Sequence, residues 1–276
     1  MEKTAIETLV RTALQEDIGT GDVTAQLIPA GAESVAVIIS REAAVIAGCP
    51  FVEEVMRQID SNIRIEWQVS DGDQVAPDDT LCVVRGNSRA LLTAERTALN
   101  FLQTLSGTAT LTRAYVRAIG EHKARVLDTR KTIPGLRLAQ KYAVTCGGGH
   151  NHRVGLFDAF LIKENHIHAA GSISAAVEEA RKIAPDILLE VEVETFAQLD
   201  EALACGVKRI LLDNFSLDEL RKAVAIAGEQ ADLEASGNID LNTIGAVAAT
   251  GVDFISTGSI TKHVTAIDLS MRFRDA

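Results

Sequence analysis

The stretch "ILLEVEVET", residues 187–195, decides between the fold classes open to this chain, because it places three glutamates within an otherwise apolar strand. Side chains alternate along a strand, so Glu190, Glu192 and Glu194 face one way and the valines between them face the other. An antiparallel strand with one solvated face would explain this alternation. In a parallel barrel the carboxylates would instead point inward and need cations, a metal ion or bound protons.

The second half of the chain repeats a unit of strand, loop and helix, which favours the barrel. Short apolar segments are separated mostly by helical segments such as "SISAAVEEARKIA" and "TFAQLDEALACG". This alternation is typical of parallel βαβ units, and six strands without a dinucleotide-binding fingerprint favour a barrel over an open sheet. The predicted strands are "ARVLD", "DAFLIK", "ILLEVEV", "KRILL", "ADLEAS" and "VDFIS".

The first third of the chain has a different pattern. Residues 34–86 alternate short strands and turns around a helix near "PFVEEVMRQI", and a helical run follows from about Arg89 to Gly120. With 276 residues and 47% hydrophobic content, the chain is long enough for one large α/β barrel or two modest domains with proper cores. We predict an α/β protein with a small N-terminal domain followed by the barrel.

The amino-acid composition limits the kinds of partner that the chain can bind and the cellular compartment in which it is expected. A net charge of −11 argues against nucleic acid or an acidic membrane surface as partner. The four cysteines lack metal-binding spacing, and "HNH" and "HIH" match no closed zinc site, so reduced thiols without a transition metal are expected. The first residues lack the pattern of a signal peptide, and no apolar run of membrane-spanning length occurs, so we expect a cytoplasmic protein.

Every predicted barrel strand ends in polar or glycine residues, and active sites of barrels lie at the carboxyl ends of their strands. An active site therefore explains the pattern better than a purely structural barrel. In it, Arg130, Lys131 and Lys163 would face the glutamates of "EVEVE". The strand ends supply residues 128–131, 163–165, Glu192, Glu194, 213–214, 236–238 and 256–258.

Basic residues gather between Glu121 and Asp158, where Asp128 is the only acid between these two limits. Within this block, "TCGGGHNHR" is predicted to end a helix begun near Pro134 and to present His152 and Arg153 on an extended segment. A flexible helix end would explain the glycines equally well. Beside Arg130 and Lys131, however, the segment forms a clamp for planar carboxylates, since guanidinium groups match carboxylate geometry.

The last two strands predict a phosphate site. "EASGNID" and "STGSITK" each place serine and glycine between a strand and a helix, where backbone amides can bind phosphate, although ordinary turns have the same composition. Glu192 and Asp213 would face the same cavity and suit Mg²⁺ or sugar hydroxyls. The predicted ligands are thus a polyanion, a metal ion and a carboxylated partner.

Several longer segments together closely resemble the quinolinate phosphoribosyltransferase family. They include "EDIGTGDVT", "LLTAERTALNFLQTLSGTAT", "LDTRKTIPGLRLAQKYAVTCGGGHNHRVGLFDAFLIKENHI", "EVEVET", "LLDNF", "EASGNI" and "VDFISTGSITKHV". The resemblance implies an N-terminal open α/β sandwich over residues 1–107, to which a tail near 266–276 would return. An incomplete parallel, TIM-like barrel would span residues 108–265.

The resemblance also implies an activity, the transfer of phosphoribose from phosphoribosyl pyrophosphate to quinolinate with loss of carbon dioxide. It assigns quinolinate to Arg130, His152 and Arg153 beside Thr129, with Arg96 coming from the partner of a homodimer. Lys131 and Lys163 would face the diphosphate, and Glu192 and Asp213 the ribose and Mg²⁺. Ser236, Gly237 and Gly258 would receive the 5′-phosphate.

Two alternatives stay open. A related transferase acting on nicotinate or another heterocyclic acid would share most of the barrel, but it would not need a clamp for two carboxylates. A biotinyl- or lipoyl-type carrier would explain the turn-rich segment "VSDGDQVAPDDTLCVVRG", which however lacks a lysine at a hairpin tip.

Overall fold

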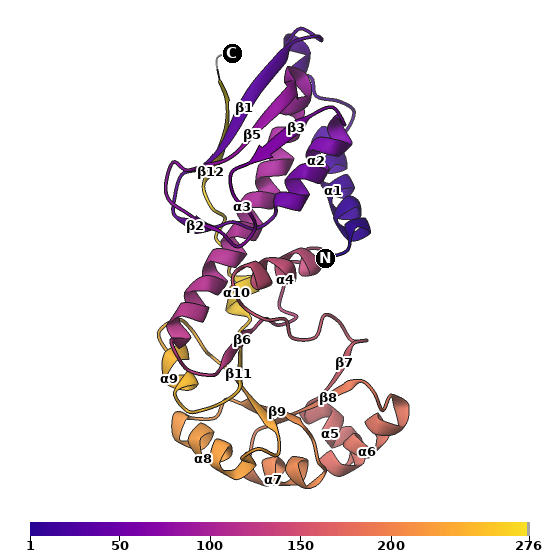
Figure 1. Ribbon diagram of the computed structural model, residues 1–276. Helices are drawn as coiled ribbons and strands as arrows, with labels where there is room; N and C mark the ends of the chain where they lie inside the picture. Colours follow the sequence, from indigo (N-terminus) through magenta and orange to yellow (C-terminus); the bar gives the residue numbers. More distant parts are fainter. Residues whose placement is uncertain (275–276) are drawn as a thin grey trace. The chain divides into compact units, whose positions relative to one another are not determined.

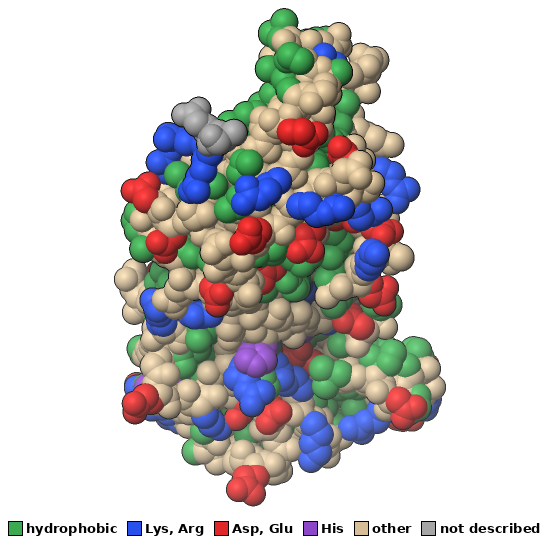
Figure 2. All heavy atoms as spheres, turned by 45° about the horizontal axis from the view of Figure 1, so that its top comes forward, with side chains coloured by type: hydrophobic (Ala, Val, Ile, Leu, Met, Phe, Trp, Pro, Cys, Tyr) green, Lys and Arg blue, Asp and Glu red, His purple; other side chains and the backbone are tan. Residues whose placement is uncertain are grey.

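The structure is a computed structural model that describes residues 1–274, and it divides the chain into two compact units. The first unit comprises residues 1–113, 133–148 and the segment from His263 onward, and the second comprises residues 114–132 and 149–262. Figure 1 shows the elements of both units, and Figure 2 shows acidic and basic side chains interspersed over one face. Within residues 1–274, no helix is both long and apolar enough to cross a membrane.

The first unit is built on an antiparallel sheet with the order β12-β1-β5-β3. Strand β12 follows the barrel in the chain and pairs along β1, with Val35 opposite Arg274 and Ser40 opposite Leu269. The predicted returning tail is therefore present as a strand, and its residues 275–276 lie outside the described part. The elements are α1 (Lys3–Ile18), η1 (Ala25–Leu27), β1 (Glu33–Ser40), β2 (Ala44–Val45), α2 (Cys49–Ile59), β3 (Arg64–Trp67), β4 (Gln74–Val75), β5 (Thr80–Asn87), α3 (Ser88–Ile119), α4 (Arg137–Cys146) and β12 (Leu269–Arg274). The last six residues of α3, 114–119, belong to the second unit.

Apolar side chains at helical spacing hold this unit together. Helix α2 begins with a proline at its first turn and buries Phe51, Val52, Val55 and Met56 on one face. Residues 137–146, which the predicted barrel segment includes, group with the first compact unit. The physical reason is that Ala139 and Ala143 of α4 belong to its hydrophobic core.

The second unit contains six parallel strands in the order β6-β11-β10-β9-β8-β7. All six strands predicted from the sequence are present. Figure 1 shows helices α5 to α9 on the outside of the curved sheet. The edge strands β6 and β7 do not pair with each other among the described residues, so the barrel is incomplete. The elements are β6 (Arg125–Leu127), β7 (Ala159–Ile162), α5 (Glu164–Ala170), α6 (Ile173–Ile183), β8 (Leu188–Val193), α7 (Phe196–Ala204), β9 (Arg209–Asp213), α8 (Leu217–Ala227), β10 (Asp232–Ser236), α9 (Ile244–Ala248), β11 (Phe254–Ser256) and α10 (Ser259–Lys262).

Strand β8 shows how the fold tolerates the glutamates of "EVEVE". Glu190 is buried, Glu192 is partly buried, and Glu194 follows the end of the strand and is exposed. The expected inward row is therefore correct for the first two glutamates and wrong for Glu194. Because the strands are parallel, their carboxyl ends meet along one edge and bring the polar strand ends together.

Candidate active site

Two cavities lie at the carboxyl ends of the strands in the second unit. The smaller has a volume of about 170 Å³ and the larger a volume of about 630 Å³. Both are lined by Thr129, Lys131, Lys163, Glu192, Ser236 and Ser256. The two cavities therefore adjoin, as a site for two different ligands requires.

The smaller cavity combines cations with apolar walls. Arg130, Arg153 and Lys163 line it together with Leu161 and Leu211. Burial and the neighbouring charge of Arg130 lower the pKa of Arg153, whereas nearby carboxylates oppose that shift. Two guanidinium groups that repel each other near an apolar wall favour a planar ligand with more than one negative charge.

The larger cavity is polar and brings the main chain close to any ligand it holds. Gly237 has a φ of +107°, and a Cβ atom at this residue would lie 2.1 Å from Oδ1 of Asn214. At Gly258, a Cβ atom would lie 2.8 Å from Cδ of Lys131. Larger residues would therefore displace the side chains that line the cavity. Glycine at both strand ends leaves main-chain amides accessible to an anion.

Acidic side chains in the larger cavity are already oriented by neighbours. The Lys163 ammonium group is hydrogen-bonded to the Glu192 carboxylate. At the end of β9, the side-chain amide of Asn214 donates to Asp213 over 2.7 Å. Asn214 itself has a left-handed backbone, with a φ of +55°. These two carboxylates offer the hard oxygen atoms that Mg²⁺ prefers.

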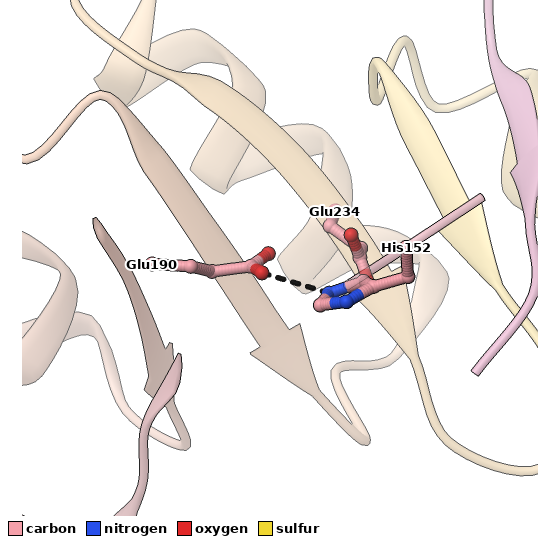
Figure 3. Close-up of side chains that lie close together, drawn as sticks. All are labelled: His152, Glu190 and Glu234. Carbon is pink, nitrogen blue, oxygen red and sulfur yellow. Dashed lines mark ion pairs between the residues drawn. The ribbon is translucent and has the colours of Figure 1, made fainter. Parts of the chain in front are cut away.

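A largely buried cluster of charges, defined here as the barrel cluster, consists of His152, Glu190, Arg209 and Glu234, and its members His152 and Glu234 line the smaller cavity. The Nε2 atom of His152 lies 2.8 Å from Glu190 and 3.7 Å from Glu234. Arg209 lies 3.4 Å from Glu190 and 2.8 Å from Glu234, and its guanidinium carbon lies 3.4 Å from the centre of the Phe254 ring. Figure 3 shows the histidine and the two glutamates converging from different segments of the second unit.

Electrostatics within the barrel cluster are strongly perturbed. Burial raises the pKa of Glu234, and the negative charge of Glu190 raises it further, against the lowering effects of His152 and Arg209. Burial lowers the pKa of His152, but the hydrogen bond to Glu190 and the nearby carboxylates outweigh it and raise the pKa overall. His152, Glu190 and Glu234 have the spacing of metal ligands. However, Arg209 already contacts both carboxylates, so the cluster holds its own cation.

The sequence analysis missed part of this cluster. We expected the cations opposite Glu190 to be Arg130, Lys131 and Lys163, but its partners are His152 and Arg209. Glu234 lies within the predicted strand "ADLEAS" and Arg209 near the start of "KRILL". A charged residue inside an otherwise apolar strand is the signal that could have identified both.

The structure brings most predicted site residues together. Those that line one or both cavities are Thr129, Arg130, Lys131, His152, Arg153, Lys163, Glu192, Asp213, Ser236, Gly237 and Gly258. Arg96 does not belong to this group, because it lies exposed on α3 in the first compact unit.

An incomplete parallel barrel with anion-binding groups at its strand ends defines a class of protein, the α/β-barrel enzymes that act on anionic substrates. Comparison with known families makes the assignment specific. Residues 22–106 match the N-terminal domain of quinolinate phosphoribosyl transferase, and residues 108–272 match its C-terminal domain. The chain belongs to the quinolinate phosphoribosyl transferase family.

Individual relatives are similar to this chain over nearly its full length. A probable nicotinate-nucleotide pyrophosphorylase (carboxylating) of Bacillus subtilis is 40% identical, with 98% of this chain and 94% of the relative covered. The solved nicotinate-nucleotide pyrophosphorylase of Francisella tularensis is 51% identical and superposes with a TM-score of 0.97, covering 99% of this chain and 98% of that one. The solved NadC of Streptococcus pyogenes is 39% identical with a TM-score of 0.96, covering 100% and 99%.

Proposed function

We infer that the protein transfers the phosphoribosyl group of phosphoribosyl pyrophosphate to quinolinate and releases pyrophosphate and carbon dioxide. The product is nicotinate mononucleotide, which makes this an enzyme of NAD biosynthesis. The observation that carries the inference is the pair of adjoining cavities, a small one lined by Arg130 and Arg153 and a large polar one. The family to which the chain belongs supports the same activity.

The acceptor ring occupies the small cavity in this proposal. Its two carboxylates bind Arg130 and Arg153 beside Thr129, because paired guanidinium groups match a dianion. Leu161 and Leu211 contact the faces or edges of the ring, which buries its apolar surface. A ring with one carboxylate would leave one guanidinium unpaired in the cavity, so quinolinate is favoured over nicotinate.

The phosphoribosyl donor occupies the larger cavity. Main-chain amides at Ser236, Gly237 and Gly258 bind its 5′-phosphate, and Lys131 and Lys163 bind the diphosphate. Glu192 and Asp213 contact the ribose hydroxyls. Lys131 and Lys163 line both cavities, so they lie where the two substrates meet.

The reaction then depends on position and charge. The bond between the ribose carbon C1′ and the diphosphate oxygen breaks, and Lys131 and Lys163 stabilise the negative charge that leaves. The ring nitrogen, held by the arginine clamp, attacks the cationic sugar carbon and forms the new bond. Its nitrogen becomes positively charged. The neighbouring carboxylate can then leave as carbon dioxide, because the cationic ring accepts its electron pair before a proton replaces it.

Magnesium is the proposed cofactor, and the donor atoms fit it. Glu192 and Asp213 line the larger cavity with carboxylate oxygens, and Mg²⁺ is usually held by one or two carboxylates together with substrate phosphates. Bound there, the ion would neutralise charge on the diphosphate as it leaves. Removing Mg²⁺ with a chelator should abolish turnover, and Asp213→Asn should raise the Mg²⁺ concentration needed for half-maximal rate.

A homodimer with shared active sites is also proposed. It rests on the family assignment and on Arg96, an exposed cation on α3 that the cavities of the second unit do not include. Arg96→Ala and Lys163→Ala should each be inactive alone. Mixing the two variants should restore part of the activity, because one site of a mixed dimer combines both intact residues. A mixture that stays inactive despite subunit exchange would contradict the shared site.

We also propose that the enzyme works in the cytoplasm, where its four cysteines would stay reduced. The direct test of the activity is a paired assay with phosphoribosyl pyrophosphate and Mg²⁺, offering quinolinate in one sample and nicotinate in the other. Product from quinolinate alone, with one carbon dioxide per nucleotide, is the expected result. Nucleotide from nicotinate would show a one-carboxylate acceptor, and product from neither would overturn the proposed acceptor.

A further inference from the structure

Both polar main-chain groups of Lys131 are bonded to threonine side chains. Its N–H donates to Oγ1 of Thr129 over 3.0 Å, and its carbonyl oxygen accepts the hydroxyl of Thr261 over 2.8 Å. We propose that Thr261 is a positioning residue that holds Lys131 at a set distance from the main chain of Gly258. This distance is the spacing between the diphosphate-binding and the 5′-phosphate-binding parts of the larger cavity, so the proposal rests on the proposed function of that cavity.

The location of Thr261 keeps it away from any ligand in the cavities. Its side chain is fully buried and lines neither cavity, whereas Ser259 and Lys262 of the same helix α10 line the larger one. An effect of Thr261 on ligand binding must therefore pass through a neighbour that does line the cavity. Lys131 is such a neighbour, although it lies 130 positions away along the chain.

The hydroxyl group of Thr261 has one proton to donate and two carbonyl oxygens within reach. The oxygen of Lys131 lies at 2.8 Å and that of Gly258 at 3.4 Å. The Gly258 oxygen already accepts the main-chain N–H groups of Thr261 and Lys262, over 3.2 and 2.9 Å. The hydroxyl therefore donates to Lys131, which is the nearer acceptor.

The side chain of Lys131 lies against the same segment of the chain. A Cβ atom at Gly258 would lie 2.8 Å from Cδ and 3.2 Å from Cβ of Lys131, so the aliphatic part of the lysine passes close to the glycine main chain. Residues 128–133 form no helix or strand. The bonds from the two threonines and the contact with Gly258 therefore determine where the Lys131 ammonium group lies.

The segment that carries Thr261 is held in place independently of Lys131. The hydroxyl of Thr257 donates to the carbonyl oxygen of Ile239 over 3.2 Å, and its main-chain N–H donates to Leu127 over 3.1 Å. Ile260 of α10 is fully buried in the second unit. Loss of the Thr261 hydroxyl should thus release the Lys131 loop and leave the main-chain amide of Gly258 where it is.

The spacing matters because one donor molecule occupies both parts of the cavity. Phosphoribosyl pyrophosphate carries its 5′-phosphate and its diphosphate on the same ribose ring. Such a ligand binds tightly only when the groups that meet its two ends are already at the matching distance. Ribose 5-phosphate lacks the diphosphate and needs only the Gly258 end, so it serves as a probe that does not depend on Lys131.

Calorimetric titration with these two ligands, in the presence of Mg²⁺ and without quinolinate, tests the proposal. Thr261→Val keeps the shape of the side chain and removes the donor, so the Kd for phosphoribosyl pyrophosphate should rise about tenfold. The Kd for ribose 5-phosphate should stay within about twofold of wild type. Thr261→Ser restores the hydroxyl and should return donor affinity to within about threefold of wild type. Equal weakening of both ligands, or a serine variant as weak as the valine variant, would overturn the proposal.

A matched control separates the proposed role from general damage to the barrel. Thr250 is also buried in the second unit and lines neither cavity, and its hydroxyl donates to the carbonyl oxygen of Val247 over 2.7 Å. Thr250→Val should keep the donor Kd within about twofold of wild type. A loss equal to that of Thr261→Val would overturn the proposal. If Thr261→Val does not fold, Thr261→Ala takes its place, because it puts no methyl group against the Lys131 carbonyl.

A double-mutant cycle shows whether Thr261 acts through Lys131. The four proteins are wild type, Thr261→Val, Lys131→Ala and the double variant, and the measured quantity is the Kd for phosphoribosyl pyrophosphate. In the Lys131→Ala background, Thr261→Val should weaken binding by less than about twofold, because the ammonium group that it positions is gone. Equal losses in both backgrounds would overturn the proposal.

Failure of the proposed function has a different signature. A wild-type protein that does not bind phosphoribosyl pyrophosphate would overturn both the proposed function and the role of Thr261. Donor binding and turnover of quinolinate by wild type, together with an unchanged donor Kd in Thr261→Val, would leave the proposed function intact and overturn the role of Thr261 alone.

Discussion

The interior of the first unit is mainly apolar, although it also buries the charged side chains of Glu54 and Lys141. Helix α3 contributes Leu99, Leu102 and Leu105, each at most 1% exposed. The interior of the second unit includes Glu190 and Glu234, which are as completely buried. Burial of apolar surface stabilises a fold, whereas a buried ion pair often contributes no more than an apolar replacement would. The contrast indicates that the barrel keeps buried charges to support the side chains at the carboxyl ends of its strands rather than to stabilise its fold.

The largest effect is expected from breaking the barrel cluster. Arg209→Ala would leave Glu190 and Glu234 buried without their guanidinium partner, which should lower the free energy of unfolding by about 3 to 5 kcal/mol. Chemical denaturation monitored by circular dichroism measures the change. A triple variant with Arg209→Met, Glu190→Leu and Glu234→Leu should regain stability without regaining activity. Recovery of activity in the triple variant would contradict the functional interpretation of the cluster.

Creating a cavity in the core of the first unit should lower the stability of the protein without changing its activity. Met56 of α2 is 1% exposed, and Met56→Ala should destabilise the protein by about 2 to 5 kcal/mol through lost contacts and the space left behind. Steady-state kinetics below the unfolding transition should show unchanged kcat and KM. The control is Met56→Leu, which keeps the volume and should cost less than about 1.5 kcal/mol. An altered KM in Met56→Ala would show that the core of the first unit also affects substrate binding, which would contradict the proposed difference between the two interiors.

Removing a cation from the rim should affect binding and leave stability nearly unchanged. Arg130→Ala deletes one charged partner of a carboxylate, so quinolinate affinity should fall by about 2 kcal/mol, roughly thirtyfold. Calorimetric titration measures the affinity, and a thermal melt of the free protein provides the control. Arg130→Lys, which keeps the charge but not the planar fork, should lie between wild type and alanine. An unchanged affinity would remove Arg130 from the clamp.

The smallest expected effect is a dependence of the free energy of unfolding on pH. The pKa of Glu234 is raised by burial and by Glu190 from its ordinary value of 4.5 to about 7, so the folded protein binds a proton that the unfolded chain has already released. Stability from this group is therefore fully present below pH 4.5 and is lost as the pH rises through about 7. The slope is at most about 1.4 kcal/mol per pH unit. Thermal melts between these values should show a flatter slope for Glu234→Gln, and an unchanged slope would assign the proton elsewhere.

The sequence predicted the barrel well because each strand carries its own signal, an apolar run followed by polar residues at the rim. Lys131, Lys163 and Asp213 were predicted this way and line the larger cavity, since the carboxyl end of a parallel strand is fixed by chain direction alone. The partners of Glu190 could not be predicted by the same route. They depend on strand order and register, which place Arg209 opposite Glu190 on the neighbouring strand.

Helix α4 illustrates a second limit. Its alanine-rich face indicates burial, but the sequence does not say against which core, and proximity along the chain suggested the barrel. Ala139 and Ala143 instead join the core of the first unit. The periodicity of apolar side chains indicates that one face of a helix is buried, but it does not indicate which part of the protein packs against that face.

The pairing of β12 with β1 has a consequence for biosynthesis. Residues 33–40 are made early, whereas residues 269–274 follow the whole barrel segment in the chain. While the ribosome is still producing the barrel, one edge of β1 has no partner, and an open strand edge invites pairing with other chains. Synthesis at about 5 to 20 residues per second makes this interval on the order of ten seconds or more. The nascent chain thus passes through a stage in which its first domain is most vulnerable to aggregation, and rapid translation of the barrel shortens it.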